Sequence, residues 1–539
     1  MLRYRAGGKK LVVSRMYKSF IIGCGRIAGY SDDGAVNDFT HGYAYRENQN
    51  VQLAGCMDRD SNKGKLFAKK FNCTAFEDYK EGIDGTKSEI VSVCTPDDTH
   101  FQIVKALIEM DSNIQVIFTM MAIGGFIKLL EVSGGATAFA RNMTHLISNR
   151  QRAQLSTWVS GISIFFTDSG NALIIGPLFR PIFKELRICK EKLAYILDST
   201  SSPICILMPF IGWGAYIMGL IDQAYSDVGL TETALSVLIK LMPYQFYAIL
   251  CLVTVPMLVF TNRDFGPMKK AQQQYEKLRL KGQSSIKDPA QTESPEPMSL
   301  FVIPLATLLM LIAGLLGWHA SNDDLTSPHI RSSLTIAYLS ASLASAILMY
   351  KIHDINLADS LDTFVKGTET MMFVVIILIL AWSLSSVISA LGTAQTLSVL
   401  IGQAFNPSIL PALIFVLGAV ISLATGSSWG TFAILMALAI PVAHNTGAPM
   451  YLTIAAVLSG GLFGDHTSPI SDTTVLASIG ADCPHIDHVT TQFYYAGVIG
   501  SVAFLAFLVT GFYPSEMIII PAIILLFTIV QVLGRKSEA

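Results

Sequence analysis

The segment "GGLFGDHTSPISDTTVLASIG" (Gly460–Gly480) carries polar and ionisable residues, although long apolar runs flank it on both sides. Asp465, His466 and Asp472 stand in it beside a row of Ser and Thr hydroxyls. Ionisable groups inside a membrane are energetically costly and usually mark a pathway for ions or substrates. The first question is therefore whether this chain spans a membrane.

The amino-acid composition answers that question. Of the 539 residues, 51% are hydrophobic and only 14% are charged, whereas a soluble globular protein has about 25% charged residues. From residue 114 onward, apolar stretches recur near the length of about 20 residues that a spanning helix needs. The chain is thus predicted to be a mainly α, polytopic, multi-pass protein of the cell membrane. We expect its apolar stretches at 115–134, 153–183, 193–220, 241–262, 300–319, 332–350, 368–391, 409–443, 450–475, 491–513 and 515–534.

Two other classes of protein receive no support from the composition. The net charge of -2 does not point to a nucleic-acid partner. The eight cysteines show no CxxC spacing, so they indicate neither a zinc site nor a disulfide framework.

The distribution of Lys and Arg predicts the orientation of the loops, because short basic loops stay in the cytoplasm. The basic segments 180–192 and 263–298 are placed inside, the second as a flexible linker, and 320–331 is placed outside. This order is consistent only if 153–183 and 409–443 are hairpins that enter and leave on the same side.

An internal repeat supports these hairpins. The stretches "DSGNALIIGPLFRP" (Asp168–Pro181) and "SWGTFAILMALAIP" (Ser428–Pro441) share a glycine and a proline eleven residues apart. Each is followed by a polar break within an apolar run, "LDSTSSP" (Leu197–Pro203) in the first copy and "GDHTSP" (Gly464–Pro469) in the second. Five predicted crossings separate the hairpins, and an odd number inverts the second copy. We therefore expect inverted repeats with re-entrant hairpins and broken helices.

Interrupted segments in two inverted halves are the best sequence pointer to the binding site of a secondary transporter. A helix broken at mid-membrane frees carbonyls and helix ends that can coordinate a cation, and such backbone is tolerated only where it lines a cavity or is buried. Asp198 and Asp465 fall at corresponding breaks, and Asp472 follows Asp465 by about two helical turns. A carboxylate holds either Na⁺ or a proton, so exchange follows from competition.

We therefore predict a Na⁺ site at Asp198, Asp465 and Asp472. Hard cations prefer oxygen ligands, which adds a wider set of candidates for ion binding and transport: Asp168, Asn171, Ser199, Thr200, Ser428, His466, Thr467, Ser468 and Thr473.

Each of these residues also has a structural interpretation. A hydroxyl in a membrane helix often bonds its own backbone or a neighbouring helix. Asp168 is a candidate cap for a helix that starts at Ser169, and His466 is a ligand, a proton carrier or an orienting donor. Three tryptophans are most simply packing residues or interface anchors: Trp213, Trp382 and Trp429.

Five stretches resemble the NhaC-type Na⁺/H⁺ antiporter family: "SGGATAFAR" (133–141), "FFTDSGNALIIGPLFRPIF" (165–183), "LAYILDSTSSPICILMPFIGWGAYIMGL" (193–220), "TGSSWGTFAILMALAIP" (425–441) and "GDHTSPISDTT" (464–474). The resemblance covers about 113–535. It implies exchange of Na⁺ for H⁺ across a lipid bilayer without a cofactor and leaves a homodimer open. Some members exchange organic acids such as malate and lactate, so that substrate class also stays open.

The N-terminal region has a different character. "KSFIIGCGRIAG" (Lys18–Gly29) predicts a strand, a glycine turn and a helix start, with Gly23, Gly25 and Ala28 in the GxGxxG/A pattern. Such a turn lets a pyrophosphate approach the backbone and the helix N-terminus. A second predicted strand ends at Asp58, where an acidic residue can bind ribose hydroxyls.

A further strand in "EIVSVCTPDDTH" (89–100) leads into Thr95, Pro96 and His100. Together these segments resemble the nucleotide-binding half of the Gfo/Idh/MocA oxidoreductases over about 18–110. The resemblance implies an NAD(P) site at Gly23, Gly25, Ala28, Asp58, Thr95, Pro96 and His100.

This N-terminal resemblance is incomplete. The oxidoreductases continue into a Glu-Lys-Pro motif that holds their catalytic lysine, whereas this chain reads "VIFTMMAIGG" (Val116–Gly125), which is membrane sequence. The substrate-binding sheet domain is missing as well. We therefore expect a truncated Rossmann-like domain at 1–112, a membrane domain at 113–539, and no dehydrogenase activity. The alternatives are an oxidoreductase fragment on a membrane anchor, a nucleotide sensor that regulates transport, and an ordinary structural turn.

Overall fold

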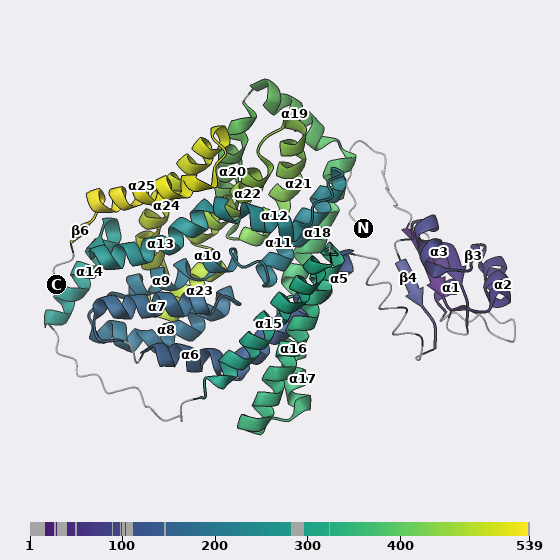
Figure 1. The fold of residues 1–539 in the computed structure, drawn as a ribbon, viewed down its shortest axis with the longest axis horizontal. Coiled ribbons are helices and arrows are strands. Elements are labelled where there is room, and N and C mark those ends of the chain that lie inside the picture. The colour runs from purple at the N-terminus through teal and green to yellow at the C-terminus, as the bar shows by residue number, and fades with distance from the viewer. Residues whose placement is uncertain are drawn as a thin grey trace, which may run out of the picture. The chain divides into compact units, whose positions relative to one another are not determined.

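The computed structural model describes residues 17–25, 28–29, 40–48, 51–88, 90–96, 99, 103, 112–144, 147–281, 296–322, 324–404 and 406–536. The chain divides into two compact units, Met1–Ser112 and Asn113–Ala539, and each is described by itself (Figure 1).

The N-terminal unit is built on a parallel four-stranded sheet. Its strands are β1 (Tyr17–Ile22), β2 (Val51–Met57), β3 (Thr74–Phe76) and β4 (Ile90–Val93), in the spatial order β3-β2-β1-β4. The helices that connect them are α1 (His41–Glu47), α2 (Ser61–Phe71) and α3 (Tyr79–Thr86). This strand order is that of one half of a dinucleotide-binding fold, so the predicted small α/β domain is confirmed.

The second unit is helical. In chain order its helices are α5 (Ser112–Val132), α6 (Gly135–Thr144), α7 (Arg150–Ser163), α8 (Asp168–Glu185), α9 (Lys190–Ser199), α10 (Ser202–Cys205), α11 (Gly212–Asp227), α12 (Ala234–Leu241), α13 (Phe246–Thr261), α14 (Gly266–Lys281), α15 (Ser299–Ser321), α16 (Ser327–His353), α17 (Leu357–Thr370), α18 (Met372–Ala390), α19 (Thr393–Ala404), α20 (Leu410–Thr425), α21 (Ser428–Thr446), α22 (Met450–Thr467), α23 (Asp472–Ala481), α24 (His485–Phe512) and α25 (Ile519–Leu533). A short antiparallel pair, β5 (Arg263–Asp264) and β6 (Arg535–Lys536), joins the end of α13 to the end of α25.

Within the described ranges, eight helical segments are long and apolar enough to cross a membrane. A ninth span is possible if the bent pair Ala234–Tyr244 and Phe246–Thr261 is counted as one. The polytopic membrane architecture is thus confirmed. The remaining predicted stretches, such as 153–183 and 450–475, are instead divided into shorter helices.

The two predicted hairpins are present as helix pairs. The first consists of α7 and α8 and the second of α20 and α21. The helices that begin at their tips are capped in the same way. The Thr167 hydroxyl accepts from the Gly170 N–H at 3.0 Å, and the Ser427 hydroxyl accepts from the Gly430 N–H at 3.4 Å. Each hydroxyl satisfies one free N–H of a helix N-terminus.

This geometry corrects the interpretation of Asp168 as the cap. The helix begins at Asp168 itself, and the capping residue is Thr167. The Asp168 carboxylate accepts from the Ser169 N–H at 2.6 Å instead.

The two predicted helix breaks are also confirmed. The first separates α9, which ends at Ser199, from α10, which begins at Ser202, and the second separates α22 from α23. The second break corrects the expected relation between Asp465 and Asp472. Asp465 lies in the last turn of α22 and Asp472 is the first residue of α23, so the two do not follow one helix. Pro469 lies between them and, lacking an N–H, does not continue the helix.

The two halves of the repeat interlock. Helix α23 of the second half packs against α8 and α9 of the first, while α11 packs against α21. Small residues permit the closest contact, because a Cβ on Gly176 would overlap the Gly480 carbonyl and a Cβ on Gly480 would overlap the Ala172 carbonyl. Close packing at small residues is how helices associate in lipid, where burial gives little driving force.

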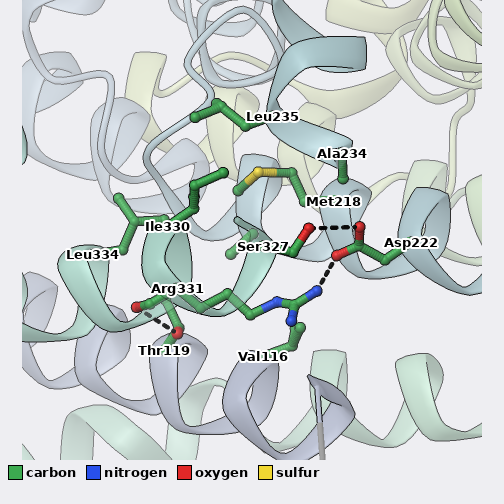
Figure 2. A pocket seen from close by; sticks show the side chains of 11 residues that line it. Val116, Thr119, Met218, Asp222, Ala234, Leu235, Ser327, Ile330, Arg331 and Leu334 are labelled. Carbon is green, nitrogen blue, oxygen red and sulfur yellow. Dashed lines mark hydrogen bonds and ion pairs between the residues drawn. The ribbon is translucent and has the colours of Figure 1, made fainter. Parts of the chain in front are cut away.

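An ion pair between Arg331 and Asp222 connects helices α16 and α11. Arg331 of α16 donates to Asp222 of α11, and Ser327 also donates to Asp222, at 3.2 Å (Figure 2). The Thr119 hydroxyl of α5 donates to the Arg331 carbonyl at 3.5 Å. A cavity of about 10 Å³ lies beside these side chains, and the Asp222 side chain is 20% exposed.

The segment 263–298 differs from the flexible linker that we expected. Its first part forms α14, and the Arg150 guanidinium donates to the Glu276 carboxylate at 2.8 Å. The Gln272 amide donates to the Arg187 carbonyl, also at 2.8 Å. These contacts dock α14 against the loop regions of the first hairpin, so the prediction of flexibility was wrong for this part.

The close contact between α20 and α22 gives a first prediction. A Cβ added at Gly464 would lie 2.6 Å from the Ser422 Cβ and 2.7 Å from the Leu423 nitrogen. We expect Gly464→Val to reduce stability by about 1–3 kcal/mol through overpacking. The measurement is the thermal unfolding midpoint of the purified protein in detergent.

Gly497→Val is the matched control, because a Cβ at Gly497 would meet no atom within 4 Å. It introduces the same side chain into a membrane helix without a clash. Equal midpoints for Gly464→Val and Gly497→Val would contradict the proposed packing.

Candidate functional site

The two helix breaks bring two aspartates into the interior of the membrane unit. Asp198 is 1% exposed and Asp465 is 2% exposed. Each lies in the last turn of its helix, α9 or α22. The C-terminal end of a helix carries partial negative charge, so both carboxylates add to sites that already favour a cation.

Asp198 is held by the second half of the repeat. Its Oδ2 atom accepts from the Thr474 hydroxyl of α23 at 3.0 Å and from the Gln492 amide of α24 at 2.5 Å. Its Oδ1 atom is buried and has no hydrogen-bond partner among the described residues. The carboxylate thus joins the halves while one oxygen remains free to bind a ligand.

Gln492 organises a wider network around this carboxylate. Its amide also donates to the His466 carbonyl at 2.6 Å, and its Oε1 atom lies 2.9 Å from His488 Nε2. His488 Nδ1 in turn lies 2.8 Å from the Ser478 hydroxyl. Polar contacts between α22, α23 and α24 therefore hold the Gln492 and His488 side chains next to Asp198.

His466 completes the network on the other side. Its Nδ1 atom lies 2.7 Å from the Tyr247 hydroxyl of α13. Its Nε2 atom lies 3.8 Å from Asp198 Oδ2 and has no hydrogen-bond partner in the part of the chain that the structure describes. The imidazole is thus oriented by Tyr247 and presents its second nitrogen toward Asp198.

Asp465 has fewer partners. Its Oδ2 atom accepts from the Ser428 hydroxyl at 3.4 Å, and Oδ1 is buried without a partner in the described ranges. Ser428 begins α21, so this bond links the second helix break to the second hairpin.

Further buried oxygens without a described partner lie at the first break or beside it, and the Ser202 hydroxyl is one of them. The Ser199 hydroxyl and the Asn171 Oδ1 atom have no hydrogen-bond partner among residues of the described segments. The Asn171 amide donates to the Gly161 and Thr200 carbonyls at 2.8 and 2.9 Å, which fixes the orientation of the side chain. A buried polar atom without a partner costs about 1–3 kcal/mol, and oxygen atoms are the ligands that hard cations prefer.

The other predicted hydroxyls have hydrogen-bond partners, three of them in the backbone and one in a side chain. The Thr200 and Thr467 hydroxyls donate to Ile196 and Phe463 carbonyls, both at 2.8 Å, as the structural interpretation anticipated. The Ser468 hydroxyl donates to the Leu423 carbonyl at 2.9 Å. Thr473 pairs with Ser471 at 3.1 Å. Their part in ion binding stays a prediction.

Asp168 and Asp472 lie elsewhere, on the wall of a cavity of about 540 Å³. The tips of both hairpins meet at this cavity, together with the start of α11 and parts of α5 and α18. Trp213 and Trp429 also line it, with ring centroids 4.8 Å apart. The sequence prediction therefore combined residues of two places, the buried pair Asp198 and Asp465 and this cavity.

Sequence reasoning missed Gln492, His488, Thr474 and Tyr247. A signal existed for the first two, because polar residues four positions apart at the start of an apolar helix share one face. Tyr247 and Thr474 carry no such signal, since their roles depend on which helices become neighbours.

The N-terminal unit arranges its candidate residues around the turn after β1. Gly23 has a φ of 88°, and a Cβ there would lie 2.8 Å from the Cys94 carbonyl oxygen. The Asp58 carboxylate follows β2 and accepts from the Cys24 N–H at 2.7 Å. A Cβ on Gly25 would meet no atom within 4 Å, so the turn leaves room beside its backbone.

These features fit the dinucleotide-binding half that the sequence predicts. Ala28 is buried, as expected for the third position of the motif, which packs helix against strand. Thr95 Oγ1 is buried without a described partner, and Pro96 follows it directly after β4. His100 lies outside the described residues. If NAD(P) binds, Asp58 would hold ribose hydroxyls and the Gly23–Gly25 turn would face the pyrophosphate.

Burial keeps the nearby thiols uncharged. It raises the pKa of Cys94 to about 11, and hydrogen bonding to Cys24, with burial, raises the pKa of Cys56 to about 12. Thiolates are the metal-binding form of cysteine, so this arrangement does not favour a metal site here.

Comparison with known proteins agrees with both units. Residues 204–512 match the model of the Na⁺/H⁺ antiporter family, and residues 17–118 match the model described as oxidoreductase family, NAD-binding Rossmann fold. An uncharacterised protein of Haemophilus influenzae is 31% identical over 417 residues, which cover 75% of this chain and 80% of that protein.

Two other proteins are similar in part or in fold. The malate-2H⁺/Na⁺-lactate antiporter of Bacillus subtilis is 31% identical over 183 residues, 34% of this chain and 38% of that protein. The YdaH transporter of Alcanivorax borkumensis shares the fold, with a TM-score of 0.55 and 16% identity over 79% of this chain and 91% of that chain.

The network around Asp198 gives a second prediction. Gln492→Leu removes the amide that donates to Asp198 and to the His466 carbonyl, and it leaves His488 Nε2 without its acceptor. Because buried polar groups without partners cost about 1–3 kcal/mol, we expect a loss of stability of that size. The measurement is thermal unfolding of the purified protein in detergent.

Gln223→Leu serves as the control for this substitution. The Gln223 amide donates to Asp227 in an exposed pair, at 2.9 Å, so its loss leaves no buried group unpaired. If both variants unfold at the same temperature, the network does not stabilise the site.

Proposed function

The chain belongs to the Na⁺/H⁺ antiporter family, and we propose that it exchanges Na⁺ for H⁺ across the cytoplasmic membrane. In this proposal the two ions compete for the buried carboxylates of Asp198 and Asp465. The observation that carries it is that each carboxylate lies at a helix break and has one buried oxygen without a described partner.

The surroundings support a site for a cation rather than an anion. Asp198 and Asp465 stand at C-terminal helix ends, where freed carbonyls and the helix dipole favour positive charge. The hydroxyl of Ser199 and the amide oxygen of Asn171 add neutral oxygen donors. No Lys or Arg side chain forms an ion pair with either aspartate within the described part of the chain.

Competition then couples the two fluxes. A deprotonated carboxylate binds Na⁺, and a protonated carboxylate does not. Each time the site changes the side of the membrane to which it is open, it therefore carries either Na⁺ or H⁺. His466 lies beside Asp198 with a free ring nitrogen, which suits it to pass a proton or to orient the carboxylate. Asp472, at the wall of the cavity, is the candidate for a relay between the cavity and the buried pair.

A second candidate is coupled exchange of an organic solute, as the name of the malate-2H⁺/Na⁺-lactate antiporter suggests for a relative. The observation that favours it is the cavity of about 540 Å³ at the hairpin tips. A cavity that holds one water molecule needs only about 10–15 Å³ of the same kind of volume. The cavity therefore has room for a molecule much larger than Na⁺.

For the N-terminal unit, we propose nucleotide binding without hydride transfer. The glycine turn and Asp58 support the first part of this proposal. The second part rests on the sequence, in which the segment after β4 continues into the membrane unit instead of a Glu-Lys-Pro motif and a substrate-binding domain.

The proposal for the aspartates is tested by Asp465→Asn and Asp198→Asn. Asparagine keeps the size and much of the hydrogen bonding but cannot exchange a proton for Na⁺. We expect each variant to fold and to lose Na⁺-dependent proton movement completely. The measurement uses proteoliposomes that contain a pH-sensitive dye and receive a pulse of Na⁺.

Asp362→Asn is the matched control, because Asp362 pairs with Lys366 on the exposed side of α17 and its side chain is 63% exposed. This variant should transport like the wild type. Normal proton movement by folded Asp465→Asn would exclude the proposed role of Asp465.

A further inference from the structure

The cavity at the hairpin tips is distinct from the buried aspartate pair. Neither Asp198 nor Asp465 lines it. Its volume of about 540 Å³ falls within the range of about 300–1,000 Å³ that is typical of pockets for small organic molecules.

The charge of the lining restricts what can bind. Four side chains of the lining are charged, namely Lys128, Glu131, Asp168 and Asp472. One positive and three negative groups give the lining a formal charge of −2. Lys128 Nζ lies 3.3 Å from Glu131 Oε2, so these two groups compensate each other. Asp168 and Asp472 have no basic partner within the segments that the structure describes, and they would repel an organic anion.

Aromatic rings lie beside Asp168. The indole N–H of Trp213 donates to Asp168 Oδ2 at 3.1 Å. The Trp429 ring packs against the Trp213 ring. The Tyr216 hydroxyl donates to the Trp429 carbonyl at 2.8 Å and so holds the Trp429 backbone in place. Aromatic faces next to carboxylates attract organic cations through cation–π interactions as well as through charge.

From this combination we infer that the cavity binds a small organic molecule with a primary ammonium group, such as an aliphatic diamine. The inference rests on the proposed function and names a second substrate class for the same transporter. The ammonium group lies between the Asp168 and Asp472 carboxylates and the Trp429 ring, while Na⁺ and H⁺ use Asp198 and Asp465. An aliphatic chain contacts the apolar part of the lining, Leu173, Phe373 and Val374.

The test uses two four-carbon probes of opposite charge, 1,4-diaminobutane and succinate, each radiolabelled. The full-length protein is reconstituted in proteoliposomes, and uptake is measured with and without a Na⁺ gradient. We expect uptake of the diamine that depends on the gradient, and no uptake of succinate. Uptake of succinate without uptake of the diamine would overturn the inference. The inference would also be overturned if protein that moves protons in response to Na⁺ took up neither probe.

Variants of Trp429 test the aromatic contact. Trp429→Leu should raise the apparent Michaelis constant for diamine uptake by about 2- to 30-fold, the range of a cation–π contribution of about 0.5–2 kcal/mol. Trp429→Phe, which keeps an aromatic face, should raise it less. If the leucine variant takes up the diamine like the wild type, the assigned position of the ammonium group is wrong.

The same preparations separate this inference from the proposed function. Na⁺-dependent proton movement, measured without diamine, reports on Asp198 and Asp465 and should persist in both Trp429 variants. Its absence in folded wild-type protein would reject the Na⁺/H⁺ proposal. Diamine uptake that persists without Na⁺ would then support the cavity assignment alone.

Discussion

The arrangement of the membrane unit depends on two buried carboxylates, Asp198 and Asp465. A charge in such a place is costly unless other groups compensate it. Asp198 is compensated by Gln492 and Thr474 through one oxygen, and Asp465 by Ser428 through one oxygen. The second oxygen of each has no described partner. This incomplete compensation costs stability, and in the proposed function it leaves an oxygen of each carboxylate available to Na⁺ or H⁺.

The inverted repeat explains how the chain builds such a site. Each half contributes a hairpin and a broken helix, and the helix beyond the break in one half packs against the hairpin of the other. Asp198 of the first half therefore takes both of its hydrogen bonds from helices of the second half. Closely packed glycines, such as Gly176 against Gly480, bring the backbones near enough for these contacts. The proposed ion site, the packing and the symmetry of the repeat thus depend on the same helices.

Features that are local in the sequence could be predicted. The hairpins, the breaks and the aligned glycines follow from apolar runs that Gly, Pro and polar residues interrupt. The sequence also indicated the parallel sheet of the N-terminal unit, because each strand leads into a recognisable turn. Features that arise from neighbouring helices could not be predicted in this way. Tyr247 lies far from the breaks in sequence. Thr474 closely follows the second break, but its bond is to Asp198 of the other half. Helix α14 docks through Gln272 and Glu276, which look like ordinary residues of a charged linker. Asp465 and Asp472 are close in sequence, which predicts one shared site. A break separates their helices, however, and Asp472 lies at the cavity.

Competition between Na⁺ and H⁺ at the buried aspartates is the central claim, and the most direct test is the pH dependence of the apparent Na⁺ constant. This constant is measured in proteoliposomes from about pH 6 to about pH 9, a range that brackets the physiological one. The account predicts that the constant falls as pH rises, by up to about tenfold per pH unit for each competing proton, and levels off once the site is deprotonated. A Na⁺ constant that does not change across this range would contradict direct competition and the role of Asp198 and Asp465 in it.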